Sequence, residues 1–108
     1  MVSSQETDHP EHSNCHVDPV EKTVSPASLR AADRAFLLVW GMGCPSCAMR
    51  VRNSLLRLDG VLAVDVDLER GLARVMYDAA QVTPEALPPA VAAAGHDGQH
   101  RYAAQILA

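Results

Sequence analysis

Residues 62 to 69 alternate between apolar and polar side chains, and this alternation is the strongest constraint on the fold. The apolar positions share an aliphatic character: Leu62, Val64, Val66 and Leu68. Successive side chains of a strand point to opposite faces, so the pattern predicts a strand with one face in a core and the other in water. Arg70-Gly71 then supplies a tight turn, and residues 73–77 continue as the partner strand of a hairpin.

The segments before this hairpin predict a strand and a helix. The apolar run over residues 35–40, ended by Gly41, predicts a buried strand. After a loop over residues 41–46, apolar side chains recur at helical spacing, which predicts an amphipathic helix ended by Asp59-Gly60. Its apolar face carries Cys47, Val51, Leu55 and Leu58. Its other face carries Arg50, Arg52, Asn53 and Arg57.

The segments after the hairpin predict a second helix and a last strand. Thr83-Pro84-Glu85 is typical of a helix start, and Gly95 is typical of a helix end. Pro88-Pro89 would lie inside that helix, where one proline costs about 3 kcal/mol. We therefore expect the regular helix to begin near Pro88, after a separate turn over residues 83–87. A weaker strand is expected over residues 101–107.

The resulting order is β-α-β-β-α-β, an α+β arrangement of the split-βαβ or ferredoxin-like type. It predicts an antiparallel four-stranded sheet with two helices on one face. The length of 108 residues suits one domain, which we place at residues 34–108. Residues 1–33 are polar, acidic and contain Pro10, Pro19 and Pro26, so we expect a disordered tail that contains His and Cys.

Composition excludes several classes of function. The net charge is −4 and aromatic residues make up 4%, which argues against a nucleic-acid-binding surface. No apolar run approaches about 18 residues, so we expect no insertion into a membrane. The first 30 residues lack a charged and then apolar leader, and a cytoplasmic protein is expected. Structural disulfides are rare in that compartment, so the three Cys are more typical of metal ligands or redox groups.

Cys44 and Cys47 form a C-x-x-C motif between the first strand and the first helix. One thiol in the loop and one in the first helical turn can point at the same spot. The positive end of a helix lowers the pKa of a thiol placed there and favours the thiolate. Two thiolates suit Cu(I) or Hg(II), and with further ligands Zn(II) or Cd(II). The motif alone indicates a redox dithiol equally well.

The surroundings of the motif favour metal binding without catalysis. A thioredoxin-like redox core needs a strand and a helix before its C-x-x-C motif, and the polar tail offers neither. A structural zinc site would need a second pair of ligands, and the predicted domain has no third Cys. We therefore expect that the protein is not an enzyme.

The chain resembles the heavy-metal-associated domain family from about Phe36 to Leu107. Five stretches carry the resemblance: GMGCPSC at residues 41–47, LDGV at 58–61, VDV at 64–66, ARVMYD at 73–78 and AGH at 94–96. The resemblance implies a ferredoxin-like fold with Cys44 and Cys47 as the metal ligands. It also implies that Met42 is a buried support for the metal-binding loop.

That family includes copper chaperones, mercury-binding proteins and N-terminal domains of metal-pumping P-type ATPases. The resemblance implies a soluble metallochaperone that passes Cu(I) by thiolate exchange to a P-type ATPase or its metal-binding domains. An ATPase domain, a Hg(II)-binding resistance protein and a metal-bridged homodimer are alternatives. Family members that carry zinc, cadmium or lead often have an acidic residue before the first Cys. This chain has Gly43 at that position, so Cu(I) is the first candidate metal and Hg(II) is the second.

Two sets of residues outside the C-x-x-C motif are further candidates. His96 stands where many bacterial copper chaperones have Tyr, and in the family fold that loop lies beside the metal. It is either an additional copper ligand or a solvent-exposed loop residue. The tail contains His9, His12, Cys15 and His16, which form either a second, flexible metal site or part of an acidic tail without that role.

Overall fold

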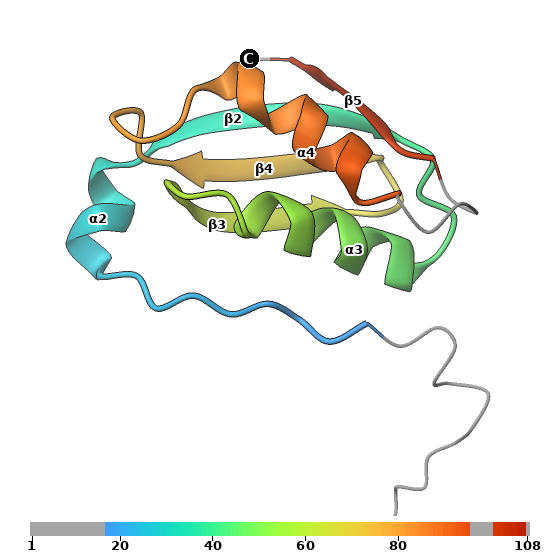
Figure 1. Ribbon diagram of the computed structural model, residues 1–108, viewed down its shortest axis with the longest axis horizontal. Coiled ribbons are helices and arrows are strands. Elements are labelled where there is room, and N and C mark those ends of the chain that lie inside the picture. Colours follow the sequence, from blue (N-terminus) through green and yellow to red (C-terminus); the bar gives the residue numbers. More distant parts are fainter. Residues whose placement is uncertain (1–16, 96–100, 108) are drawn as a thin grey trace, which may run out of the picture.

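The computed structural model describes residues 17–95 and 101–107. Its four strands form one antiparallel sheet in the order β3-β4-β2-β5, and α3 and α4 cover one face of that sheet (Figure 1). The elements of this domain are β2 (Asp33–Trp40), α3 (Pro45–Leu56), β3 (Val61–Asp67), β4 (Leu72–Tyr77), α4 (Leu87–Ala93) and β5 (Ala103–Ile106). The predicted α+β ferredoxin-like class is confirmed.

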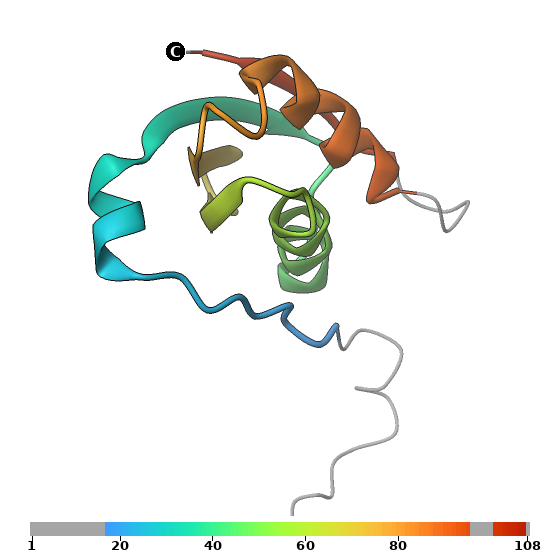
Figure 2. The same cartoon turned by 60° about the vertical axis from the view of Figure 1, so that its left-hand side comes forward.

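The core lies between the sheet and the two helices, which Figure 2 shows as two separate layers. Side chains with no exposed surface come from both layers: Leu37, Val51, Leu55, Val61, Val75, Leu87 and Val91. Burying one such side chain stabilises the fold by about 1.5–3 kcal/mol. The apolar stripes predicted for the two helices are therefore what attaches these helices to the sheet.

The starts of α3 and α4, and the turn that follows α3, are explained by nearby proline and glycine residues. Pro45 and Pro88 lie in the first turns of α3 and α4, where the amide that proline lacks has no partner inside the helix. A short 3-10 helix, η1 (Pro84–Ala86), precedes α4, so the predicted separate turn is confirmed. Gly60, in the turn from α3 to β3, has a φ of 93°. Across the described ranges, no helix is long and apolar enough to cross a bilayer.

Strand β2, predicted as a buried strand over residues 35–40, is present but is buried on one face only. Ala35, Leu37 and Val39 point into the core, whereas Phe36 is 41% exposed and Trp40 is 48% exposed. Both helices lie on the same face of the sheet, so alternate residues of β2 are left on the opposite face. A short apolar run cannot distinguish one covered face from two.

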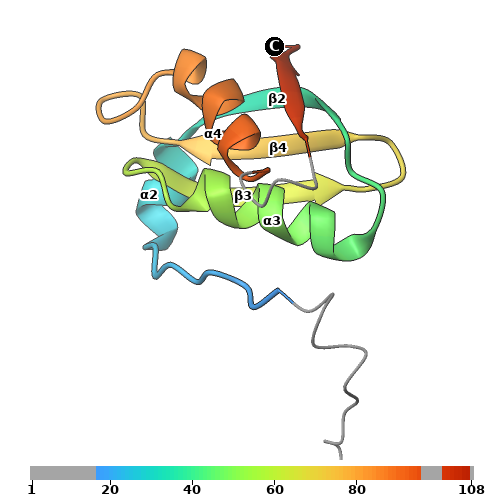
Figure 3. The same cartoon turned by 45° about the vertical axis from the view of Figure 1, so that its right-hand side comes forward.

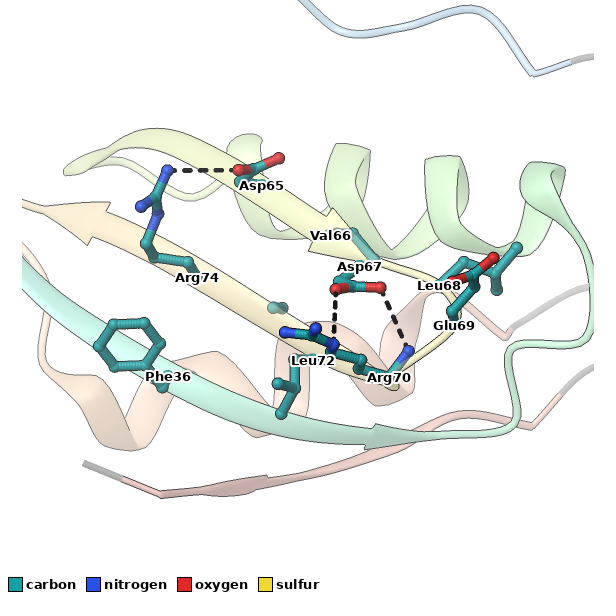
Figure 4. Close-up of a pocket in the computed structure, with 10 residues that line it drawn as sticks. Phe36, Asp65, Val66, Asp67, Leu68, Glu69, Arg70, Leu72 and Arg74 are labelled. Carbon is teal, nitrogen blue, oxygen red and sulfur yellow. Dashed lines mark hydrogen bonds and ion pairs between the residues drawn. The ribbon is translucent and has the colours of Figure 1, made fainter.

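The uncovered face of the sheet carries a shallow hollow of about 730 Å³ beside the β3–β4 hairpin (Figure 4). Phe36 and Leu72 form part of its apolar lining. Arg74 pairs with Asp65 across the two strands, with 3.2 Å between nitrogen and oxygen. Among the described residues, no Cys or His lines the hollow, so these residues do not offer the donors of a site for a soft metal.

The segment before β2 is structured from residue 17 onward, which corrects part of the predicted tail. It contains α2 (Pro26–Ala31), whose N-terminal Ser25 accepts a hydrogen bond from the amide of Ser28. Within the described part of the chain a helix therefore precedes β2, although a strand does not. Residues 1–16 lie outside the described residues, and the boundary between tail and domain at residue 33 stays a prediction.

Residues 17–22, called the strap below, lie along α3 because Asn53 binds their backbone (Figures 1 and 3). The amide of Val20 donates to Asn53 Oδ1 at 2.8 Å, and Asn53 Nδ2 donates to the carbonyl of Asp18 at 2.7 Å. Asn53 is only 2% exposed, so its expected place on a polar, solvent-facing side of the helix is wrong. Burying an amide side chain is tolerated because both of its polar atoms have partners.

Two basic side chains add further bonds to the strap. Arg52 donates to the carbonyl of Val20 at 2.9 Å. Lys22 donates to the carbonyls of Leu58 and Val61 at 2.9 and 2.6 Å, where α3 has ended and β3 begins. The strap is therefore held by polar contacts to the C-terminal half of α3 and to the turn and strand that follow it.

We predict that Asn53→Ala lowers the free energy of unfolding by about 1–3 kcal/mol, because its two hydrogen bonds to the strap, of about 0.5–1.5 kcal/mol each, are lost. Urea denaturation followed by circular dichroism measures the change. In a chain that begins at Ser25 the same substitution should cost far less, because its partners are already gone. Equal costs in the two chains would contradict a role for Asn53 in holding the strap.

Candidate metal centre

Cys44 and Cys47 meet at the N-terminal end of α3, with their sulfur atoms 3.2 Å apart. Cys44 is the residue that caps the helix, and Cys47 lies in its first turn, where its amide donates to the carbonyl of Cys44 at 3.0 Å. Both are free thiols. Cys47 is 3% exposed, whereas Cys44 is partly exposed. The structure thus places one sulfur in the core and one at the surface.

The loop before Cys44 is shaped by Gly41 and Met42. Gly41 has a φ of 100°, and a Cβ there would collide with the backbone carbonyl of Arg101. This loop therefore passes directly against the chain that leads into β5. Met42 is partly buried and packs against the core, and its role as a support of the metal-binding loop stays a prediction. Gly43 has open space around it.

Ser46 is a functional neighbour that the sequence analysis did not single out. Its Oγ lies 3.1 Å from the sulfur of Cys44. A hydroxyl that donates to a thiolate stabilises the charged form, and this bond is the main reason why the pKa of Cys44 falls from 9.0 to about 7. The Cys47 thiol and the backbone amides of Cys47 and Ser46 act in the same direction. A hydroxyl residue between the two Cys was the available sequence signal.

Two thiols are the whole donor set within the described residues. In residues 17–95 and 101–107, no three Cys, His, Asp or Glu side chains come together as a metal cluster would require. The remaining candidates lie outside the described residues: His9, His12, Cys15, His16 and His96. Thiolates without hard oxygen ligands favour a soft, thiophilic ion.

The present sulfur separation is too short for a metal ion held in a straight line between the two thiolates. With metal–sulfur bonds of about 2.3 Å, that arrangement needs about 4.6 Å between the sulfurs. The two sulfurs are 3.2 Å apart, so a linear arrangement would require them to separate. Cys47 is buried in the first turn of α3, whereas Cys44 precedes that helix and is partly exposed.

Residues 36–97 match the model of the heavy-metal-associated domain, so the chain belongs to this family. The copper chaperone CopZ of Staphylococcus aureus is 38% identical over 61 residues, which cover 56% of this chain and 90% of that protein. A copper-binding domain from HMA7, a P-type ATPase, matches with a TM-score of 0.63 and 29% identity, over 69% of this chain and 93% of that chain. A solved structure of a CopZ metallochaperone matches with a TM-score of 0.57 and 32% identity. The match covers 68% of this chain and 100% of that chain.

We predict that Ser46→Ala raises the apparent pKa of Cys44, because the thiolate loses its strongest hydrogen-bond donor. The rate of alkylation of the reduced, metal-free protein, followed at Cys44 by peptide mass spectrometry, should then reach its midpoint above about pH 7. Ser54→Ala, in the same helix but away from the thiols, is the control. An unchanged midpoint for Ser46→Ala would refute the assignment.

Proposed function

We propose that this protein is a copper metallochaperone that binds Cu(I) between Cys44 and Cys47 and passes it on by thiolate exchange. The observation that carries the proposal is the pair of thiols 3.2 Å apart, one buried and one at the surface. The similarity to CopZ proteins and to a copper-binding ATPase domain supports the choice of copper. Metal binding and transfer need no catalytic group, which agrees with a protein that is not an enzyme.

The donor set favours Cu(I) over the other candidate metals. Cu(I) accepts a low coordination number with soft sulfur ligands, whereas Zn(II) and Cd(II) would need further ligands. Gly43 supplies no carboxylate next to the thiols. Hg(II) shares the preference for two thiolates and is the second candidate.

The partly exposed Cys44 supports transfer to a partner. A lowered pKa keeps this sulfur available as a thiolate near neutral pH, and its exposure gives an incoming thiolate access to the metal. We propose a metal-binding domain of a P-type ATPase as the acceptor, in the cytoplasm, where thiols stay reduced. The similarity in fold to a copper-binding ATPase domain supports this choice. The alternative is that the present domain is itself the N-terminal metal-binding domain of a P-type ATPase.

We predict that Cys44→Ser and Cys47→Ser each weaken Cu(I) binding and that the double variant loses tight binding. Competition with a chromophoric Cu(I) chelator under anaerobic reducing conditions measures the affinity. Ser54→Ala is the control, because this variant keeps both thiols of the motif and changes no candidate metal ligand. Tight binding by the double variant would overturn the proposed site.

The same Cys variants also distinguish a metallochaperone from a dithiol redox protein. A dithiol oxidoreductase would reduce insulin disulfides with turnover, and its activity would depend on Cys44 and Cys47. A metallochaperone should show no such turnover, and it should instead transfer Cu(I) to a purified ATPase metal-binding domain. A metal-bridged homodimer would be seen as a concentration-dependent change in mass when Cu(I) is added.

His96 remains a candidate additional ligand. The described chain stops at Gly95, directly after α4, and His96 is the next residue. Two thiolates are sufficient ligands for Cu(I). We therefore predict that His96→Phe weakens Cu(I) binding by about tenfold at most, which is the effect typical of residues that support the metal ligands. His100→Phe is the matched control. Equal Cu(I) affinities for the His96→Phe protein and the unchanged protein would show that His96 is not a ligand.

A further inference from the structure

Large apolar side chains are exposed on the face of the sheet that α3 and α4 leave uncovered. Within residues 17–95 and 101–107, the large apolar side chains that stay exposed are Phe36, Trp40 and Leu107, at 41%, 48% and 52%. Phe36 and Trp40 alternate with the core residues of β2, so both point to the uncovered face. The amide of Leu107 donates to the carbonyl of Phe36 at 2.7 Å, which places Leu107 beside Phe36 on that face.

The strand register joins these side chains into one apolar patch, called the sheet patch below. Paired residues of neighbouring strands point to the same face, so Leu38 lies beside Leu72 of β4. Trp40 likewise lies beside Ala103 of β5. The members of the sheet patch are Phe36, Leu38, Trp40, Leu72, Ala103 and Leu107. Single exposed apolar side chains are common, but a continuous patch across three strands indicates an interaction surface.

The charged side chains that border the sheet patch balance one another. On the β3–β4 hairpin, Arg74 pairs with Asp65 at 3.2 Å. Arg70 pairs with Asp67 at 3.7 Å on the same hairpin (Figure 4). These four side chains are 47% to 77% exposed, so they can also meet charges on another surface. A border with both signs complements a copy of itself, whereas a strongly acidic or basic partner would meet like charges there.

The net charge of the domain also allows two copies to approach each other. Residues 33–108 carry eight Asp and Glu against seven Arg, which gives a net charge of −1. At physiological salt, exposed charges interact over about 8 Å, so repulsion between two such domains is weak. An open sheet face suits a second sheet, because sheets pack face to face about 10 Å apart in β-sandwiches.

We propose that a second copy of this chain covers the sheet patch, with two protomers packed sheet against sheet about a two-fold axis. The helices α3 and α4 of both protomers then lie on the outside of the dimer, because they cover the other face of each sheet (Figure 2). The sheet patch contains neither Cys44 nor Cys47, so this dimer needs no metal ion. It therefore differs from a metal-bridged homodimer, in which thiolates would join the two copies.

The size of the sheet face determines how strong such a dimer is. Four strands about 4.8 Å apart, each with about six residues that rise about 3.3 Å, cover roughly 400 Å² in projection. A standard interface buries about 800 Å² of accessible surface on each partner, so this face is at the lower end. We therefore expect a reversible dimer with a dissociation constant of about 10–100 µM.

Trp40 is the one Trp of the chain, so its fluorescence reports on the sheet patch directly. In the reduced, metal-free full chain, its emission should shift to shorter wavelength as the concentration rises from about 1 µM to about 1 mM. Sedimentation velocity should show a monomer and a dimer in exchange over the same range. A chain that stays monomeric throughout would overturn the proposal.

Phe36→Ser tests whether the sheet patch is the interface. We expect this change to weaken dimerisation by at least about tenfold, because an aromatic side chain is removed from the middle of the patch. Leu29→Ser removes a partly exposed apolar side chain of α2, outside the patch, and should leave dimerisation unchanged. Circular dichroism verifies that both variants are folded. A dimer that Phe36→Ser does not weaken would overturn the proposal.

Charge reversal tests whether the partner is a second copy. Arg74→Asp and Asp65→Arg each leave an excess of one sign at the border, so each variant should form a weaker homodimer than the unchanged chain. In an equal mixture, the two variants should form more heterodimer than random pairing gives. Native mass spectrometry distinguishes the species by mass. Random pairing in the mixture would contradict the proposed complementarity of the two borders.

Two further results would assign the sheet patch or the dimer differently and would overturn the proposal. One is a dimer that forms only with Cu(I) and is lost in Cys44→Ser, which would be bridged by metal. The other is a monomeric chain in which Phe36→Ser slows Cu(I) transfer to a purified ATPase metal-binding domain, which would make that domain the partner. The metal-free measurements do not depend on the proposed copper function, so the two proposals can fail separately.

Discussion

The packing of α3 on the sheet is the constraint on which the geometry of the Cys44–Cys47 pair depends. Cys47, Val51 and Leu55 form one buried row of this helix and are 3%, 0% and 0% exposed. The helix cannot turn about its axis without exposing that row to water, so Cys47 has a fixed position in the molecule. Cys44 precedes the first turn and lies on the loop that follows Gly41. The same packing thus places one sulfur in the core and one partly exposed sulfur at the positive end of the helix.

Much of the fold could be predicted because local patterns determine its elements. The alternation from Leu62 onward, the turn at Gly71 and the effect of Pro88-Pro89 on α4 depend only on neighbouring residues, and the structure has the hairpin and the late start of α4. The spacing of Cys44 and Cys47 likewise predicts a shared position at a helix start, which is what the structure shows. These features need no knowledge of the distant parts of the chain.

The features that escaped prediction involve contacts across the chain. Asn53 is polar and was expected to face water, but its partners are the backbone groups of Asp18 and Val20, more than thirty residues away. Nothing in the helical periodicity around Asn53 indicates such a partner. The exposure of Phe36 depends on both helices packing on the opposite face of the sheet, which is a property of the tertiary structure. The contact between Ser46 Oγ and the sulfur of Cys44 depends on the side-chain conformations of both residues, which the sequence does not show.

The core and the strap are held in place by different kinds of interaction. The strap is attached mainly by hydrogen bonds of side chains to backbone, each worth about 1 kcal/mol, and not by a row of fully buried aliphatic side chains. Local opening of such a segment costs much less than unfolding of the domain. Opening of the strap would therefore leave Cys47 in place, because Cys47 is part of the buried core, whereas Val20 alone among the strap residues packs against that core.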